Sequence, residues 1–189
     1  VGPWALGEES QDFIHDLRGF DKFQGWDNQL ENEPGFQLVY EKKHKLIPTP
    51  KSGFGADFIG HYGGSLGNIA IYANAGAEYR IGWNIPDDFG TSAVRPGGDN
   101  SSPDTPATPG LGFHLFLSTD VRLVAHDIFL DGNTFRSSHS VSKEHLVADA
   151  ALGFSFSYDE FKLSFARIHR TKEFKQQSGA HNYGSLSIS

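Results

Sequence analysis

The sequence contains no cysteine, no methionine and no long run of apolar residues. Without cysteine, the chain forms no disulfide bond and offers no thiolate ligand to a metal ion. A membrane-spanning helix needs roughly 18 or more consecutive apolar residues, so helical membrane proteins are excluded as a class. The mean hydropathy of −0.40 resembles that of soluble proteins. It also fits a membrane barrel, because barrel strands alternate polar and apolar residues and dilute the average.

Positive charge is scarce as well. The chain has 16 Lys and Arg against 23 Asp and Glu, a net charge of −7 over 189 residues. No stripe of basic side chains reverses this balance, which argues against a general nucleic-acid-binding protein. The chain opens on Val1-Gly2-Pro3-Trp4 without a charged region followed by an apolar one. We therefore expect a mature chain or an internal fragment of one domain, and the absent signal peptide indicates nothing about the compartment.

Aromatic residues and glycine are abundant, and one stretch of the chain shows a clear period of two. One face of residues 70–83 carries Ile71, Ala73, Ala75, Ala77, Tyr79, Ile81 and Trp83, and the other carries Tyr72, Asn74, Gly76, Glu78, Arg80 and Gly82. Only a β-strand sends neighbouring side chains to opposite faces. The stretch is longer than the usual globular strand of about 5–6 residues, but it suits a tilted strand that crosses a membrane.

Six further segments show strand patterns, which makes seven strands in all. They are Gly35–Lys43, Gly53–His61, Leu111–Leu130, Ala148–Tyr158, Phe161–Thr171 and Tyr183–Ser189. We expect the basic run at 42–45 to close the first of these and residues 62–68 to form a turn. The one helical pattern is Glu8–Leu17, ended by Gly19, and the proline-rich segment Ile85–Gly110 is predicted to be loop or disorder.

The polar faces of these strands indicate which side is wet. They hold charges of both signs, at Glu78, Arg80, Asp120, Arg122, Asp149 and Lys162. A dry soluble core does not accommodate such charges, whereas a barrel lumen pairs and hydrates them. Soluble barrels and sandwiches alternate too, so periodicity alone leaves them open. The pattern favours an all-β fold, a transmembrane antiparallel β-barrel with a short helix in an extracellular loop. We treat residues 1–189 as a single barrel domain, with helix and loop in 1–34 and strands in 35–189.

Several motifs in chain order carry a family resemblance. They are Gly7–Gln11 with His15; Gly25–Leu30 with Asn32-Glu33-Pro34; Gly63–Asn68 with Tyr72–Gly76; Asn84–Gly90; Ile128–Phe135 with His139-Ser140-Val141; and Arg170–Phe174 with Gly184-Ser185-Leu186. With these motifs the chain resembles the outer-membrane lipid A 3′-O-deacylases. The resemblance covers nearly the whole chain and corresponds to roughly the C-terminal two-thirds of such a protein.

The resemblance implies a twelve-stranded barrel in the bacterial outer membrane, acting on lipid A of lipopolysaccharide. It implies hydrolysis of the 3′ acyloxyacyl ester, dependent on calcium, at a site between the barrel wall and a helix of an outward-facing loop. Missing first strands would explain the odd strand number, because single-chain barrels of bacteria close with an even one. We expect the complete barrel to be monomeric and this part alone to be inactive.

Strand counting gives an independent expectation for the orientation. If the last strand runs towards the periplasm, the helix with Gln11 and His15 lies on the outer side, where an enzyme that acts on surface lipopolysaccharide needs its base. The same count places the long segment 85–110 on the periplasmic side, where barrel turns are usually short.

His15 is the predicted catalytic base. A neutral imidazole takes a proton from water near neutral pH, as ester hydrolysis requires. Gln11 lies one helical turn earlier on the same face, so its amide would orient the ring or the water. Asp21 either steadies the imidazolium or is an ordinary loop carboxylate. The alternative for His15 is a half-exposed histidine of an amphipathic helix with no catalytic role.

Substrate and metal sites are less well defined. Arg167 and Arg170 either meet lipid A phosphate or anchor the barrel at the interface, and Trp26 either contacts an acyl chain or is buried under its loop. We assign no metal ligand: Asp127, Asp131 and Asn133 are interpreted as a turn rather than a calcium loop, and Asp87-Asp88 as solvated loop residues rather than paired carboxylates. The calcium ligands implied by the resemblance are expected outside this chain.

Two competing functions remain at this stage. One is a non-catalytic outer-membrane barrel of porin or structural type. The other is a soluble lipocalin-like carrier, which the charged faces disfavour.

Overall fold

The structure is a computed structural model that describes residues 1–90, 110–159 and 161–188. Its strands are β1 (Gln37–Ile47), β2 (Phe54–Gly67), β3 (Ala70–Trp83), β4 (Leu111–Asp127), β5 (Leu146–Tyr158), β6 (Phe161–Arg170) and β7 (His181–Ile188). Its helices are α1 (Gly7–Arg18) and α2 (Ile128–Asp131), with single 3₁₀ turns η1 (Pro3–Ala5) and η2 (Trp26–Asn28). None of the described helices has the length and apolar character needed to cross a membrane.

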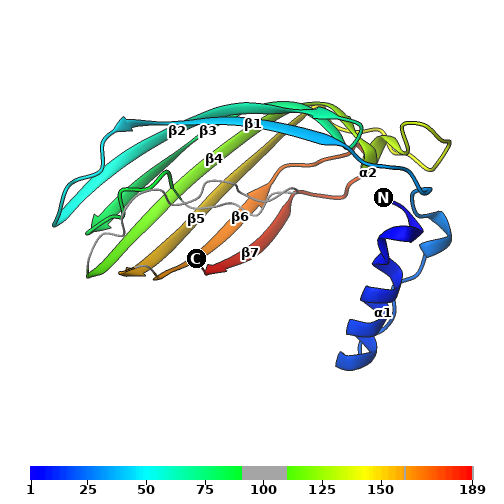
Figure 1. The fold of residues 1–189 in the computed structure, drawn as a ribbon, viewed down its shortest axis with the longest axis horizontal. Helices are drawn as coiled ribbons and strands as arrows, with labels where there is room; N and C mark the ends of the chain where they lie inside the picture. Colours follow the sequence, from blue (N-terminus) through cyan, green and yellow to red (C-terminus); the bar gives the residue numbers. More distant parts are fainter. Residues whose placement is uncertain (91–109, 160, 189) are drawn as a thin grey trace.

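The strands form one antiparallel sheet in which each strand pairs with the next along the chain, from β1 to β7. Figure 1 shows that the sheet is strongly curved and that α1 lies clear of it. β1 and β7 lie at the two edges of the sheet, and no pairing joins them within the described residues. The predicted all-β antiparallel fold with seven strands and a short helix is confirmed.

The two faces of the sheet differ as the sequence predicts. On β3, Tyr79 and Trp83 are exposed, whereas Arg80 is fully buried between them. The exposed face continues across the sheet with Phe113, Leu115, Leu117, Leu152, Phe154, Phe156 and Phe165. We call this the outer face, and we call the face with Asp57, Arg80 and His114 the inner face. The rows of large apolar side chains therefore point away from the buried polar side chains, as in a barrel wall with lipid outside.

Three predicted boundaries are wrong. β1 does not end at the basic run but continues through Lys45 to Ile47. The basic run fits within the strand because Lys43 and Lys45 point to the inner face. β2 runs unbroken to Gly67 instead of turning at 62–68. β4 ends at Asp127 rather than Leu130, because the Asp127 carboxylate accepts a hydrogen bond of 2.9 Å from the backbone N–H of Phe129 and caps α2.

The strand connections gather at two ends of the sheet. At one end, which we call the α1 end, lie residues 1–36, the turn at 68–69, the segment 128–145 and residues 171–180. At the other end, the C-terminal end, lie residues 48–53, the segment that begins at Asn84 and the last residue of β7. α1 and the end of the last strand thus lie at opposite ends of the sheet (Figure 1), as strand counting predicts.

Candidate functional site

α1 carries the predicted base, and its ends follow ordinary helix chemistry. Glu8 and Glu9 lie in the first turn, where carboxylates complement the helix dipole, and Gly19 ends the helix at φ 65°. The apolar stripe of the helix is exposed: Phe13 is 68% exposed and Leu17 is 75% exposed. The helix therefore does not pack this stripe against the described strands.

His15 is held in a defined orientation by the loop that follows α1. Its Nδ1 lies 2.5 Å from the backbone oxygen of Asp21. A carbonyl oxygen only accepts hydrogen bonds, so Nδ1 carries the proton and Nε2 of the neutral ring is left with its lone pair. The rings of Phe20 and Phe23 pack on the imidazole, with centroids at 5.8 Å and 4.7 Å. His15 is thus half-buried, fixed at Nδ1 and available as a base at Nε2.

Lys22 fastens the same loop to the helix. Its ammonium lies 3.1 Å from both the Asp12 and the Asp16 carboxylates, one turn apart on α1. Hydrogen bonds to Asp12 and then Asp16 raise the pKa of Lys22, so its ammonium stays charged throughout the physiological pH range. The backbone oxygen of Asp21, one residue earlier, is thereby kept against the imidazole.

The other predicted members of the site lie as follows. Gln11 is exposed one turn before His15 on α1. Asp21 contributes its backbone oxygen to His15, and its side chain is exposed. The main chain of Asp21 therefore contacts the ring, whereas the sequence predicted a role for its carboxylate.

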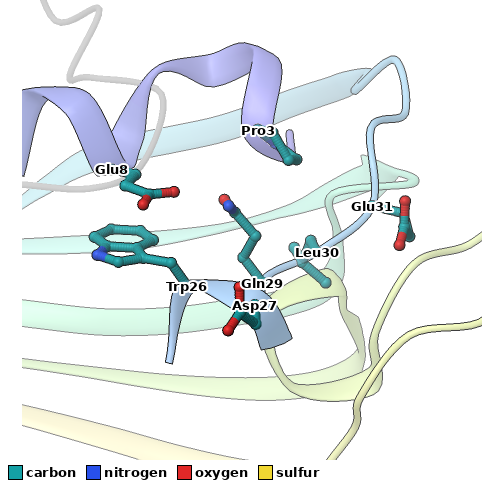
Figure 2. Close-up of a pocket in the computed structure, with 7 residues that line it drawn as sticks. All are labelled: Pro3, Glu8, Trp26, Asp27, Gln29, Leu30 and Glu31. Atoms are coloured by element: carbon teal, nitrogen blue, oxygen red, sulfur yellow. The ribbon is translucent and has the colours of Figure 1, made fainter. Parts of the chain in front are cut away.

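Trp26 lines an open pocket of about 250 Å³ between η2 and the start of α1. Figure 2 shows the indole lying beneath Glu8, with Gln29 and Leu30 alongside. Three carboxylates, of Glu8, Asp27 and Glu31, also line the pocket. The indole N–H is buried and has no hydrogen-bond partner among the described residues. Trp26 is therefore half-buried in largely polar surroundings.

Arg167 and Arg170 lie on opposite faces of β6. Arg167 is exposed on the outer face, opposite Leu152 and Gly184 of the neighbouring strands. Arg170 faces inward, where Nε lies 2.7 Å from Oδ1 of Asp149 and Nη2 lies 2.9 Å from Oδ2. Its Nη1 also lies 3.3 Å from the Glu173 carboxylate. The structure does not bring the two arginines together.

A buried carboxylate joins the α1 region to the rest of the chain. Glu33 is 6% exposed and accepts hydrogen bonds from the side chains of Asn68 and Asn133 and from the backbone of Thr134 and Phe135. Asn133 also exchanges two hydrogen bonds with the backbone of Glu31. We call this group the Glu33 joint; it ties residues 31–33 to the segment after α2 and to the turn between β2 and β3.

Replacing Glu33 with alanine is expected to loosen the α1 region while the strands stay folded. Burial alone would raise the pKa of Glu33, but the hydrogen bonds from Phe135, Asn133, Thr134 and Asn68 lower it. The ionised Glu33 joint therefore stabilises the folded protein fully above the ordinary glutamate pKa of about 4.3. This contribution is lost as the pH falls through the lowered pKa of Glu33 in the folded state. Limited proteolysis of residues 1–36 at pH 7 measures the effect, with Glu144→Ala as a matched control. Cleavage at the wild-type rate would contradict the assignment.

The described residues do not suggest a metal site. They contain no group of three or more His, Asp or Glu side chains placed to hold an ion. Asp131 instead binds Lys143, at 2.6 Å, and Asn133 belongs to the Glu33 joint. Asp88, predicted to be solvated, is bonded to Arg80 and lies 2.7 Å from Lys162; that part of the prediction is wrong. Asp87 is exposed as expected, but it pairs with Lys45.

Sequence reasoning missed two groups that the structure assembles. The members of the Glu33 joint are about 35 and 100 residues apart in the chain, and only their place in the motifs with Asn32-Glu33-Pro34 and Ile128–Phe135 drew attention to them. Asp57 was missed as the partner of Arg80. The position of Asp57 in the alternation of β2 could have indicated this pairing, because it places a charged side chain on the inner face.

Three comparisons with known proteins bear on these observations. The family model described as "Outer membrane protein LpxR" matches residues 1–189. Among solved structures, the chain is similar to LpxR from Salmonella typhimurium, with 21% sequence identity and a TM-score of 0.81. The match covers 99% of this chain and 62% of the Salmonella chain, so the chain spans less than two thirds of that protein's length. No curated protein matches the chain.

Proposed function

The chain belongs to the family of the outer membrane protein LpxR, and on this premise we propose that it is part of a hydrolase that removes the 3′-linked acyloxyacyl chain from lipid A. The observation that carries the proposal is the geometry at His15. Its Nδ1–H is held by the backbone oxygen of Asp21, and Nε2 is left as the free basic nitrogen. A base fixed in one tautomer is what activation of water requires.

The proposed place of action is the bacterial outer membrane. The exposed apolar outer face of the sheet suits lipid, and its inner face holds paired charges. We propose that the α1 end faces outward, which brings His15 towards surface lipopolysaccharide. We also propose that the complete barrel acts as a monomer. Among the described residues no strand pairs with the outer edges of β1 and β7, and such edges cannot face lipid, so we expect residues 1–189 alone to be inactive.

The proposed reaction uses the chain's own groups as follows. Nε2 of His15 takes a proton from water, and the resulting hydroxide attacks the carbonyl carbon of the 3′ ester. The tetrahedral intermediate collapses with cleavage of the bond between carbon and the sugar oxygen. The imidazolium returns its proton to that oxygen, so that the products are the acyloxyacyl acid and a free 3′ hydroxyl. The contact with Asp21 stabilises the transient imidazolium through Nδ1–H.

Calcium is implied by the family resemblance and stays a proposal. Calcium takes six to eight oxygen ligands, and the described residues bring together no such set. The ligands would have to come from other residues, and the proton transfer at His15 is independent of where they lie.

For substrate binding, the structure favours Arg167 over Arg170 as a phosphate ligand. Arg167 is exposed and has no partner among the described residues, whereas Arg170 would have to leave Asp149 to bind a phosphate. Trp26 is the weaker candidate, because its ring is half-buried and its N–H is buried. We keep Arg167 as the leading substrate-binding candidate.

The proposal is tested with the full-length protein reconstituted with lipid A. Release of the 3′ acyloxyacyl acid is followed by mass spectrometry, in the presence and absence of a calcium chelator. We expect the 3′ acyloxyacyl acid to be the only acyl product, and its release to be lost with chelator if calcium takes part. A folded full-length protein that leaves lipid A intact under both conditions would refute the proposed function.

Replacing Gln11 with alanine is expected to lower kcat by up to about tenfold, the worth of one neutral hydrogen bond to the attacking water. KM should stay unchanged, because the amide is proposed to act on water rather than on the lipid. Gln176→Ala, another exposed glutamine at the α1 end of the sheet, is the matched control. An unchanged kcat in Gln11→Ala would remove this residue from the mechanism.

A further inference from the structure

The segment Asn84–Gly90 turns back onto the inner face of the sheet directly after β3. Asn84, at φ 47°, accepts a hydrogen bond from Gly53 N–H at 2.9 Å and donates one to the backbone oxygen of Leu111 at 3.2 Å. These contacts pin the turn to the beginnings of β2 and β4. Ile85, the next residue, is only 2% exposed. The chain therefore enters the hollow of the sheet instead of leaving it.

A fully buried ion pair receives this segment. Arg80 of β3 and Asp57 of β2 are both 0% exposed and form two parallel hydrogen bonds, of 2.8 and 2.5 Å. The same guanidinium bonds the Asp88 carboxylate and lies 3.3 Å from the backbone oxygen of Pro86. Arg80 thus uses its remaining donors to hold the returning segment, because all five of its N–H groups need acceptors when buried.

Two consecutive carboxylates of the segment contact strands that lie near opposite edges of the sheet. Asp87 pairs with Lys45 of β1, and Asp88 lies 2.7 Å from the ammonium of Lys162 of β6. Lys162 also reaches the backbone oxygen of Gly90 at 3.4 Å. The Lys45 ammonium lies 5.5 Å from the centre of the Phe89 ring. Every residue from Pro86 to Gly90 is therefore in contact with a buried or half-buried group of the sheet.

These contacts mean that the segment spans the hollow of the sheet. β1 and β6 are separated by four strands, which is roughly 24 Å measured along the sheet at about 4.8 Å per strand. Two adjacent residues can reach both strands only because the sheet is curved and the segment runs straight across its concave side. The crossing lies at the C-terminal end of the sheet, opposite α1 (Figure 1).

We propose that Asn84–Gly90 is a built-in plug that closes the barrel interior to ions and small solutes at the end opposite α1. Among the described residues, the α1 end, where His15 lies, is then the end at which the interior stays open to solvent. The plug is fixed by charges rather than by apolar packing alone. Although burial would raise the pKa of Asp88, the charges of Lys162 and Arg80 lower it to about 2. Its carboxylate therefore stays ionised, and the plug stays bonded, at neutral pH.

Ion conductance of the full-length protein in planar lipid bilayers tests the plug. In potassium chloride at pH 7 we expect almost no current through the wild type. In Asp88→Ser we expect a current about tenfold or more above the wild type, because loss of the central carboxylate raises the population of the open state. The Lys162 side chain is 17% exposed and keeps the backbone oxygen of Gly90, and Arg80 keeps Asp57, so the fully buried charge is still paired in this variant.

Two further variants keep the test decisive. Asp27→Asn removes the same charge at an exposed position of the α1 end and should leave the current unchanged. Lys45→Gln combined with Asp87→Asn releases only the β1 side of the plug, and a smaller rise is expected even if Asp88→Ser fails to fold. Folding is checked by resistance to dodecyl sulfate before heating. A wild type that conducts freely, or folded variants that conduct no more than the wild type, would overturn the proposal.

Discussion

Replacing His15 with glutamine is expected to lower kcat for release of the 3′ acyloxyacyl chain by about 10²–10⁴-fold, the usual contribution of a general base. Glutamine is polar and close to histidine in size, and the ion pairs of Lys22 with Asp12 and Asp16 remain, so the loop at 20–23 should stay in place. What it lacks is a basic nitrogen at the position of Nε2. KM should change little, because the base is proposed to contact water rather than the lipid.

A matched histidine variant separates a role in catalysis from general damage to the protein. His44→Gln is the control, since His44 is an exposed histidine on the outer face of β1, stacked on Tyr62. A His15→Gln protein with wild-type kcat would remove His15 as the base, and a shared loss in His44→Gln would point to general damage.

Replacing Arg80 with leucine is expected to destabilise the folded barrel by about 3–5 kcal/mol, because the buried Asp57 carboxylate keeps the hydrogen bond from Thr49 but loses its charged partner. Asp57 and Arg80 are both inaccessible to solvent, so water does not replace the lost bonds. The change also removes the guanidinium from Asp88. Urea unfolding of the full-length protein in lipid vesicles, followed by tryptophan fluorescence, measures the loss.

A double variant separates the buried charge from the loss of packing. In Arg80→Leu with Asp57→Asn, the residual charge is gone, so part of the lost free energy of unfolding should return. Arg136→Ala, at an exposed loop position, should change the free energy by less than about 0.5 kcal/mol. Equal stability of Arg80→Leu and the wild type would show that the pair is solvated in the complete barrel.

The alternation of polar and apolar residues was sufficient to predict the strands because it is a local property. β3 was predicted with the bounds it has in the structure, and its two faces are those read from its sequence. β5 and β6 were predicted to within two residues at each end. These strands have regular side-chain alternation and turn residues at their ends, so local chemistry and the final sheet agree.

β2 was misread because glycine has two uses that sequence alone does not distinguish. Gly63 and Gly64 suggest a turn, but both lie within the strand. A β-carbon on Gly63 would lie 2.2 Å from the backbone oxygen of Tyr40, and one on Gly64 would lie 2.7 Å from that of Tyr72. Glycine is present here because neighbouring strands approach closely, and that approach exists only in the assembled sheet.

The amino-acid sequence by itself determined the strand pattern, the face that each side chain takes, the helix with His15 and the family resemblance. Only the tertiary structure decided which groups meet: the backbone oxygen of Asp21 with His15, Glu33 with Asn133, and Arg80 with Asp57 and Asp88. The physical reason is range. Alternation and helix capping act between neighbours in the chain, whereas pairing of buried polar groups depends on sheet register and curvature, which bring distant residues within hydrogen-bonding distance.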